Sequence, residues 1–265
     1  IGYEYTNREN QHAHFSADAA LMFMQSGDEY ENIQAIWDWR KLPGVTAYED
    51  GNKIPLSAVA DILEGRQYVP NDTEAVNGYA SDDCLVTAFE LRRDGMSGKK
   101  VVVCFEDCVV AFGTGLGCSL PGVSHLTTAL DQTHYYSGEK VGRNWVYHND
   151  RGYVVLDGAS LHLSTDVQHG DWYDIDNTLP AKPSSGRVFK LWIEHDTSSM
   201  NNSYAYVILP NTSARGVAKW AKQPKVRILE NTSECQSIQY GNRICRITWH
   251  DVNTKPTIEV FEGKE

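Results

Sequence analysis

The chain has 265 residues, of which 41% are hydrophobic and 11% aromatic, so it can build a full core and is not a disordered protein. Its formal net charge of −11 argues against nucleic acid or an anionic membrane as a broad partner, because such binding needs clustered Lys and Arg. No apolar run approaches the ~20 residues of a membrane helix, and the first residues show neither the basic start nor the apolar stretch of a signal peptide.

Short segments in which apolar and polar residues alternate recur along the chain, as is typical of β-strands. Turn signals such as Asp94-Gly95 and Asp157-Gly158 separate many of them. This spacing predicts an all-β fold, a large antiparallel β-sandwich. The strands are predicted at 20–25, 84–92, 99–113, 152–158, 161–168, 187–195, 203–210, 225–230, 245–250 and 257–263.

Helix is scarce in this pattern. The best candidate is 213–223, where Val217, Trp220 and Ala221 share one face and Pro224 ends the segment. A single helical turn is predicted in the segment EYENIQAIW. Residues 211–224 could mark a seam before a terminal β-hairpin module.

Six cysteines are present, and none forms a Cys-x-x-Cys pair, so the spacing does not favour zinc. Buried free thiols are the favoured interpretation. Cys235 and Cys245 flank a hairpin turn at Gly241-Asn242, which leaves a cross-strand disulfide as a less favoured alternative.

Trp37 and Trp39, in the motif Trp-Asp-Trp, have two interpretations. They could stack on sugar rings, or they could belong to a core, which is the commoner place for tryptophan. Gly113–Gly117 has the look of a phosphate loop but lacks the lysine and the following helix, so a β-bulge is favoured. His12, His14 and Asp18 lack the spacing of a convincing metal site, and structural histidines are favoured.

Several ordered blocks together resemble the chondroitin and hyaluronan lyases of polysaccharide lyase family 8. "NREN" followed by "ADAALMFMQSGDEYENIQAIWDWRKLPGVT" resembles the family's N-x-E-N and WDW signature. "GKKVVVCFEDCVVAFGTGLGCS" with "VSHLTTALDQT" resembles its central hairpin. "GYVVLDGASLHLSTDVQHGDWYDIDN" and "RVFKLWIEHDTSSMNNSYAYVILP" resemble two further blocks. The resemblance runs from about residue 4 to 210 and is loose over the last 55 residues.

The resemblance implies that the chain is the central domain, a super-sandwich of galactose-mutarotase-like type, with 225–265 leading into a small C-terminal sandwich. In such lyases a helical toroid carries a Tyr, a His, an Arg and an Asn that perform β-elimination on a uronic acid. No toroid sequence lies within these residues, so we expect the chain alone to be inactive. The implied partners are an upstream toroid of the parent protein and an acidic polysaccharide, chondroitin sulfate or hyaluronan.

By alignment on N-x-E-N, the resemblance implies a catalytic role for Glu4, which would orient the toroid Arg, and substrate contact by Asn7. Without the resemblance, Asn7-Arg8-Glu9-Asn10 indicates no more than a turn or a helix cap. The alternative function is a non-catalytic carbohydrate-binding β-sandwich module. Because the substrates lie outside cells, a periplasmic or secreted bacterial protein is expected.

Calcium is the only cofactor that the resemblance raises, since some family members hold Ca²⁺ around the WDW motif. Asp38 fits one such position, but Arg40 occupies another. Glu49 and Asp50 could compensate. Calcium needs six to eight oxygen ligands, so an arginine in the shell argues against the site, and no metal ligand is assigned.

Overall fold

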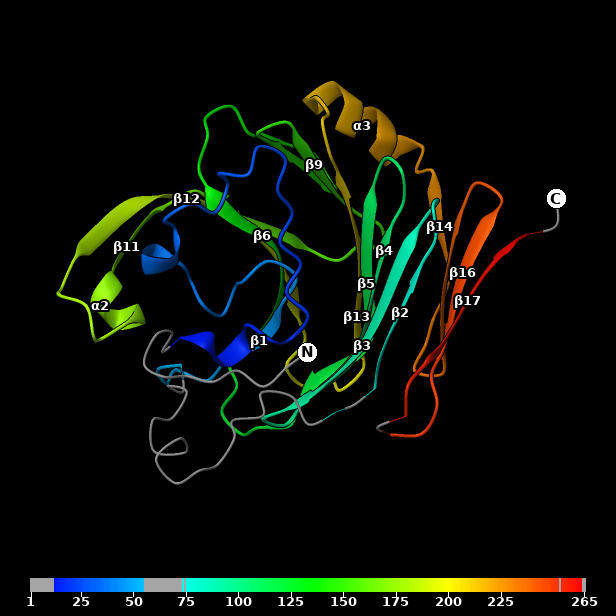
Figure 1. Cartoon of the computed structure of the whole chain (residues 1–265), viewed down its shortest axis with the longest axis horizontal. Coiled ribbons are helices and arrows are strands. Elements are labelled where there is room, and N and C mark those ends of the chain that lie inside the picture. Colours follow the sequence, from blue (N-terminus) through cyan, green and yellow to red (C-terminus); the bar gives the residue numbers. More distant parts are fainter. Residues whose placement is uncertain (1–11, 55–72, 74, 253, 264–265) are drawn as a thin grey trace. The chain divides into compact units, whose positions relative to one another are not determined.

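A computed structural model describes residues 12–54, 73, 75–252 and 254–263. Antiparallel strands dominate the described residues, which confirms the predicted all-β fold (Figure 1). The chain divides into two compact units. The first unit takes residues 1–72, 121–136 and 161–195, and the second takes 73–120, 137–160 and 196–265.

The first unit is built on one antiparallel sheet with strand order β1-β6-β12-β10, in which β11 pairs with the beginning of β12. Among the described residues of this unit, short helical turns form at η1 (Ala13–Phe15), η2 (Gln34–Ile36) and α2 (Trp172–Ile175). The strands are β1 (Thr46–Glu49), β6 (His125–His134), β10 (Leu161–Ser164), β11 (Val167–Asp171) and β12 (Pro183–His195).

Alternation along β12 decides which face of this sheet is polar. Leu191 and Ile193 are fully buried, whereas Lys190, Trp192 and Glu194 point to the other face and stay partly exposed. The burial of every second residue is what the sequence pattern of 187–195 predicted.

The second unit contains two antiparallel sheets. The larger has the order β2-β3-β4-β5-β13-β9-β8-β7, and the smaller is the meander β14-β15-β16-β17. The larger comprises β2 (Val76–Ala80), β3 (Leu85–Arg93), β4 (Met96–Cys104), β5 (Val109–Cys118), β7 (Lys140–Val141), β8 (Trp145–His148), β9 (Arg151–Val155) and β13 (Asn202–Leu209). The smaller comprises β14 (Val226–Asn231), β15 (Cys235–Tyr240), β16 (Arg243–Thr248) and β17 (Thr257–Glu262).

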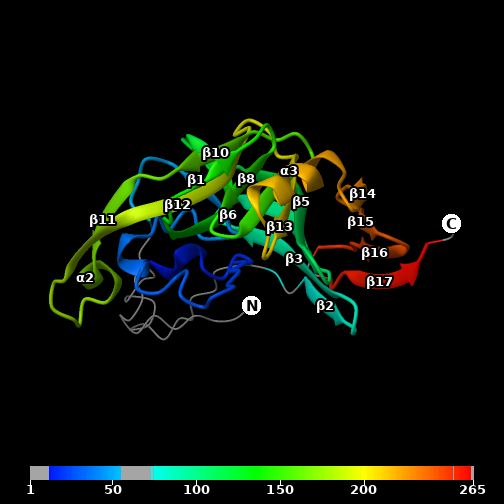
Figure 2. The same cartoon turned by 90° about the horizontal axis from the view of Figure 1, so that it is seen from above.

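One hydrophobic core joins these two sheets. It unites buried residues of the larger sheet, such as Val86 and Val101, with Ile238, Cys245 and Ile247 of the smaller one. In Figures 1 and 2 the smaller sheet, coloured orange to red, forms a layer beside β2 and β3. This face-to-face packing is a β-sandwich.

Helix α3 (Ala214–Lys222) confirms the predicted helix at 213–223. The Ser213 hydroxyl accepts a hydrogen bond from the Gly216 N–H at 3.2 Å and caps the first turn. Val217 is fully buried, and Trp220 and Ala221 pack against the core, as the helical spacing predicted.

The fold decides three points of the sequence analysis. Residues 20–25 form no strand, so that prediction is wrong. Residues 99–113 are divided between β4 and β5 by a turn, in which the Phe105 N–H donates to the Cys108 carbonyl at 2.9 Å. Cys235 lies opposite Thr248 and Cys245 opposite Ile238, so these two cysteines are not cross-strand neighbours and the alternative of a disulfide between them fails.

The segment Gly113–Gly117 lies within β5, opposite an irregular stretch of β4 between Ser97 and Lys99, which confirms the predicted bulge. Gly115 has φ +62, a conformation that favours glycine. Among the described residues no helix has the length and apolar character needed to cross a bilayer.

Candidate functional site

The two residues with predicted roles in the lyase reaction, Glu4 and Asn7, lie outside the described residues. Their roles therefore stay predictions. The other predicted site, around the Trp-Asp-Trp motif, lies fully within the described part of the first unit.

The two tryptophans of this motif pack inward. Trp39 is 7% exposed, and its indole N–H donates to the Gln34 carbonyl at 3.2 Å. Trp37 meets Trp39 edge to face, with ring centroids 5.4 Å apart, and packs against the cluster around Tyr30 and Ile33. Of the two interpretations left open by the sequence, the core role describes Trp39. Stacking on a sugar would require an exposed ring face.

Asp38, between the tryptophans, forms ion pairs with two lysines. Its Oδ2 lies 2.9 Å from Lys190 Nζ and 3.5 Å from Lys41 Nζ. Lys41 also pairs with Glu49. Both ammonium groups lie near the ring of Trp192, at 5.5 and 5.9 Å from its centroid. The result is a compact charged network, here called the Asp38 network, built from Asp38, Lys41, Glu49, Lys190 and Trp192.

The pKa values follow from this geometry. Burial by itself would raise the pKa of Asp38, but the charges of Lys190 and Lys41 outweigh it and hold the pKa below its ordinary value. Burial would lower the pKa of Lys41, but Asp38 and Glu49 outweigh it and raise that pKa. The charged forms are therefore the stable ones at neutral pH.

Calcium does not fit this site. Asp38 is paired with two lysines and Glu49 with one. Arg40 donates to the carbonyl of Tyr48 at 3.0 Å and lies 3.5 Å from Asp50. Every carboxylate of the predicted set therefore faces a fixed cation, whereas Ca²⁺ needs six to eight oxygens free to converge on it. No group of three or more His, Cys, Asp or Glu in the described residues could hold a metal.

Further polar groups extend along the same sheet. The ring of His162 stacks on Trp192 with centroids 5.6 Å apart, and His125 pairs with Glu194. The hydrogen bond to Glu194 is the main cause that raises the pKa of His125. These residues did not appear as candidates in the sequence. For Trp192 and Glu194 the sequence signal was the alternation in 187–195, which placed them with Lys190 on one face without indicating a function.

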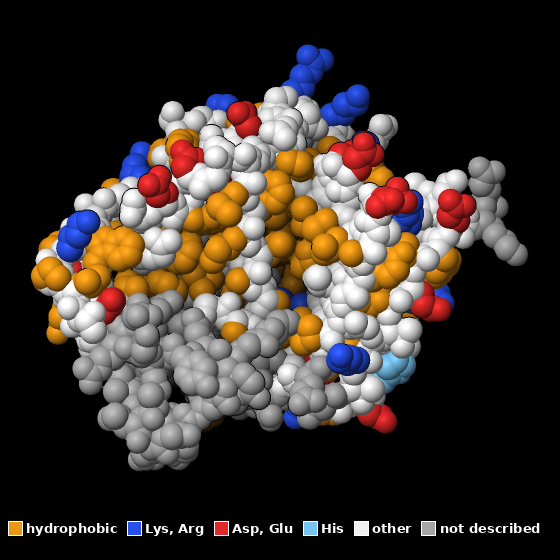
Figure 3. Space-filling model, viewed as in Figure 1, with side chains coloured by type: hydrophobic (Ala, Val, Ile, Leu, Met, Phe, Trp, Pro, Cys, Tyr) orange, Lys and Arg blue, Asp and Glu red, His pale blue; other side chains and the backbone are white. Residues whose placement is uncertain are grey.

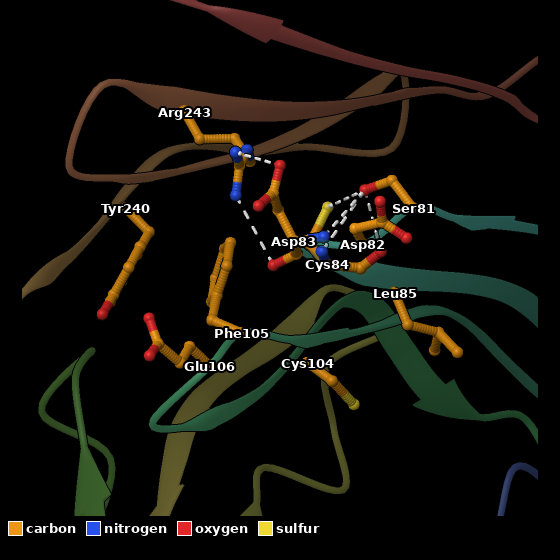
Figure 4. A pocket seen from close by; sticks show the side chains of 10 residues that line it. All are labelled: Ser81, Asp82, Asp83, Cys84, Leu85, Cys104, Phe105, Glu106, Tyr240 and Arg243. Atoms are coloured by element: carbon orange, nitrogen blue, oxygen red, sulfur yellow. Dashed lines mark hydrogen bonds and ion pairs between the residues drawn. The ribbon is translucent and has the colours of Figure 1, made fainter.

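A cleft of about 600 Å³ lies in the second unit, between the β2–β3 turn and the β15–β16 hairpin (Figure 4). Tyr240 stacks on Phe105 with ring centroids 4.6 Å apart, and its hydroxyl donates to Asp107 at 2.9 Å. Arg243 binds Asp83 at 2.8 Å on the other side. The lining residues are Ser81, Asp82, Asp83, Cys84, Leu85, Cys104, Phe105, Glu106, Tyr240 and Arg243.

The charge of this cleft decides what it can bind. It carries three carboxylates, Asp82, Asp83 and Glu106, against one guanidinium, Arg243, which is already paired. A polyanionic sugar would be repelled there. On the face of the molecule in Figure 3, basic side chains lie scattered among acidic ones and form no continuous stripe.

Known proteins match this chain over most of its length. The family model for the super-sandwich domain of polysaccharide lyase family 8 matches residues 1–221. Chondroitinase-AC of Pedobacter heparinus is 29% identical over 254 residues, which cover 89% of this chain. Xanthan lyase of a Bacillus species is 30% identical over 173 residues, or 54% of this chain.

A solved structure of a chondroitinase AC lyase superimposes with a TM-score of 0.86 at 26% identity, over 98% of this chain and 42% of that one. The chain spans 35% of the chondroitinase-AC sequence and 18% of the xanthan lyase sequence. It therefore corresponds to a part of each relative. With the family model matched over most of its residues, the chain belongs to polysaccharide lyase family 8, of which it carries the super-sandwich domain.

Proposed function

We propose that this chain is the central domain of a glycosaminoglycan lyase that cleaves chondroitin sulfate or hyaluronan by β-elimination. The observation that carries the proposal is the match of the family model to residues 1–221, supported by the 29% identity to a chondroitinase AC. A helical toroid domain of the parent protein would supply the main catalytic groups.

In this reaction a base removes the proton at C5 of the uronic acid, and the bond from C4 to the bridging oxygen breaks. The electron pair of the C5–H bond becomes the C4–C5 double bond, and an acid protonates the leaving oxygen. The uronate carboxylate must be neutralised while negative charge develops beside it. Glu4 would serve as a positioning residue, holding an arginine of the toroid through a bidentate ion pair, and Asn7 would contact the substrate.

The charge distribution supports this division of roles. The lysines of the Asp38 network are paired with carboxylates, and the cleft of the second unit is acidic. A sulfated polysaccharide would therefore depend on basic groups from the other domain. The isolated chain should yield no product.

The decisive experiment compares Glu4→Gln with Glu262→Gln in the parent protein, following the unsaturated uronate by its ultraviolet absorbance. Glu262 is exposed on β17 and serves as the matched control. Loss of the ion pair that positions the toroid arginine should lower kcat by about a hundredfold or more, as for other groups that orient transition-state contacts. An unchanged kcat in Glu4→Gln would refute the role of Glu4.

The isolated chain separates the lyase proposal from the binding-module alternative. Incubated with chondroitin sulfate or hyaluronan, it should give neither product nor saturable binding. Saturable binding without product, with no helical domain upstream in the parent, would favour a carbohydrate-binding module. We also propose export to the periplasm or the medium, because the substrates lie outside cells. Cell fractionation with an antibody to this domain tests that placement.

A further inference from the structure

An asparagine followed directly by a glycine lies at the edge of the larger sheet of the second unit. Strand β2 is the first strand in the order of that sheet, next to the smaller sheet (Figures 1 and 2). Asn77 and Gly78 lie within β2, and the Asn-Gly pair occurs once in the sequence. Asn77 is partly buried, whereas Gly78 is exposed to solvent.

The hydrogen-bond pattern between β2 and β3 leaves the Gly78 N–H at the outer edge of the sheet. The Glu90 N–H donates to the Ala75 carbonyl at 3.0 Å. The Ser81 N–H donates to the Cys84 carbonyl at 2.9 Å. Bonded and non-bonded pairs alternate along an antiparallel ladder, so these two bonds assign the odd-numbered residues of β2 to the bonded pairs. Gly78 belongs to a non-bonded pair, and its N–H therefore points away from β3.

The side chain of Asn77 receives this N–H. The Gly78 N–H donates to Asn77 Oδ1 at 2.9 Å. At the other end of the same amide, Asn77 Nδ2 donates to the Pro256 carbonyl at 2.8 Å. Both ends of the side-chain amide are held, and its carbon, Cγ, lies one bond beyond the oxygen that the Gly78 nitrogen contacts. Because Pro256 directly precedes β17, the amide also links the edge of the larger sheet to the smaller sheet.

We propose that Asn77 is a site of spontaneous deamidation, in which the Gly78 nitrogen is the nucleophile and the product loses the link to the smaller sheet. The fold presents a backbone nitrogen that lies outside the ladder and holds an amide group beside it, which is the arrangement that an intramolecular attack needs. Glycine has no Cβ to obstruct the approach. The exposed edge admits the water that completes the reaction.

The reaction has two balanced steps. Hydroxide removes the proton of the Gly78 nitrogen, which attacks Asn77 Cγ and closes a succinimide ring. The bond from Cγ to Nδ2 breaks, and the side-chain nitrogen takes a proton from water and leaves as ammonia, which restores the hydroxide. Water then adds to a ring carbonyl and breaks its bond to the ring nitrogen, which regains a proton. Opening at the side-chain carbonyl gives aspartate, and opening at the main-chain carbonyl gives isoaspartate.

Both products lose the contact with Pro256. In aspartate an oxygen replaces the Nδ2 donor and would face the Pro256 carbonyl oxygen, so two acceptors meet without a proton between them. Isoaspartate also routes the main chain through the former side-chain carbon, which disturbs the pairing of residue 77 with Ala88. We expect both forms to unfold at a lower temperature than the unmodified chain.

The test follows the folded full chain during incubation in mildly alkaline buffer, by peptide mapping that separates asparagine, aspartate and isoaspartate. Conversion of Asn77 should be at least as fast as in a free peptide with the sequence of residues 75–82, because the fold holds the reacting groups together. Asn202 is the internal control. Its Nδ2 donates to three carbonyls at 2.9–3.1 Å, and serine follows it, so it should stay intact over the same time.

Two variants separate the chemistry from its consequence. In Gly78→Ala the new Cβ would meet the Val86 carbonyl oxygen at 3.7 Å, an ordinary contact, so this variant should fold like the wild type. Its conversion at Asn77 should be slower by about tenfold or more, because the Cβ obstructs the attacking nitrogen. Asn77→Asp reproduces one product and should lower the thermal midpoint, and circular dichroism verifies that both variants are folded.

Three results would overturn the proposal. The first is a conversion of Asn77 that is slower in the folded chain than in the peptide. The second is an equal rate in the wild type and in Gly78→Ala, which would mean that the Gly78 nitrogen does not attack. The third is an unchanged thermal midpoint in Asn77→Asp, which would mean that the amide does not link the two sheets.

Discussion

Replacing Lys190 by methionine tests whether the Asp38 network is held together by its charges. Methionine keeps a flexible, apolar stem beside Trp192 but removes the ammonium group that lies 2.9 Å from Asp38 Oδ2. The same group also donates to the Gln168 side chain at 3.0 Å. The substitution therefore removes charge and two hydrogen bonds while nearly preserving volume.

The expected loss follows from the depth of the pair. The side chains of Lys190 and Asp38 are 15% and 27% exposed, so solvent screens the interaction only in part. A hydrogen bond between charged groups contributes about 1.5–3 kcal/mol. Lys41 remains 3.5 Å from Asp38, which compensates partly. We expect Lys190→Met to lower the free energy of unfolding by about 2 kcal/mol at pH 7.

The pH dependence gives the prediction its specificity. The pKa of Asp38 is lowered in the folded protein, so its contribution is present above the ordinary value of 3.8 and is lost as the pH falls through the folded value. The difference between wild type and Lys190→Met should therefore shrink on acidification toward and below that pH.

Urea unfolding followed by far-ultraviolet circular dichroism measures these differences, with Asp38→Asn completing a double-mutant cycle. Lys140→Met, at an exposed position of strand β7, is the control and should change stability little. A coupling energy near zero between Lys190 and Asp38, or a loss in Lys190→Met that is the same at every pH, would refute the reasoning.

Three further predictions concern the metal, the packing and a tyrosine. Because lysines and Arg40 already face the carboxylates, neither calcium nor a chelator should shift the thermal midpoint, and a clear stabilisation by calcium would contradict this. Gly170→Ala should lower the free energy of unfolding in urea by about 2–4 kcal/mol, because the new Cβ would lie 1.8 Å from the Ala35 carbonyl oxygen. The control is Gly186→Ala, whose Cβ would meet only a side-chain carbon at 3.1 Å, so its loss of stability should be much smaller. Burial and the hydrogen bond to Asp107 raise the pKa of Tyr240 to about 12, so Asp107→Asn should lower it in a spectrophotometric titration, and an unchanged titration would exclude that bond.

The local pattern of apolar and polar residues predicted those elements that have one buried face and one face exposed to solvent. The strand at 187–195 shows one buried and one polar face, and the helix at 213–223 carries both an apolar stripe and a Ser213 cap. In both cases the period of the side chains matches the period of the backbone. Strand β6 was missed because nearly all its residues are buried, so its two faces do not differ in polarity.

Residues 20–25 show the opposite case. Leu21 and Phe23 are less exposed than Met22 and Met24, so alternation is present, yet no strand in the described part of the chain pairs with them. Between the described residues, the hydrogen bond from the Leu21 N–H to the Pro43 carbonyl at 2.7 Å does not by itself make a strand pair. The alternation of apolar and polar residues indicates which side chains face the core. A strand also needs a neighbouring strand with which to form backbone hydrogen bonds.

Sequence by itself determined the all-β class, the helix at 213–223 and, through ordered blocks of residues, the family. Only the tertiary structure decided what surrounds Asp38. Lys190 lies far along the chain from Asp38, and no local spacing relates the two. Pairing of β12 with β6 places Lys190 opposite Gln132, whose side chain in turn accepts from the Asp38 N–H at 2.8 Å. A carboxylate motif holds a metal or a lysine according to which side chains the fold brings to it, because charge acts through space and not along the sequence.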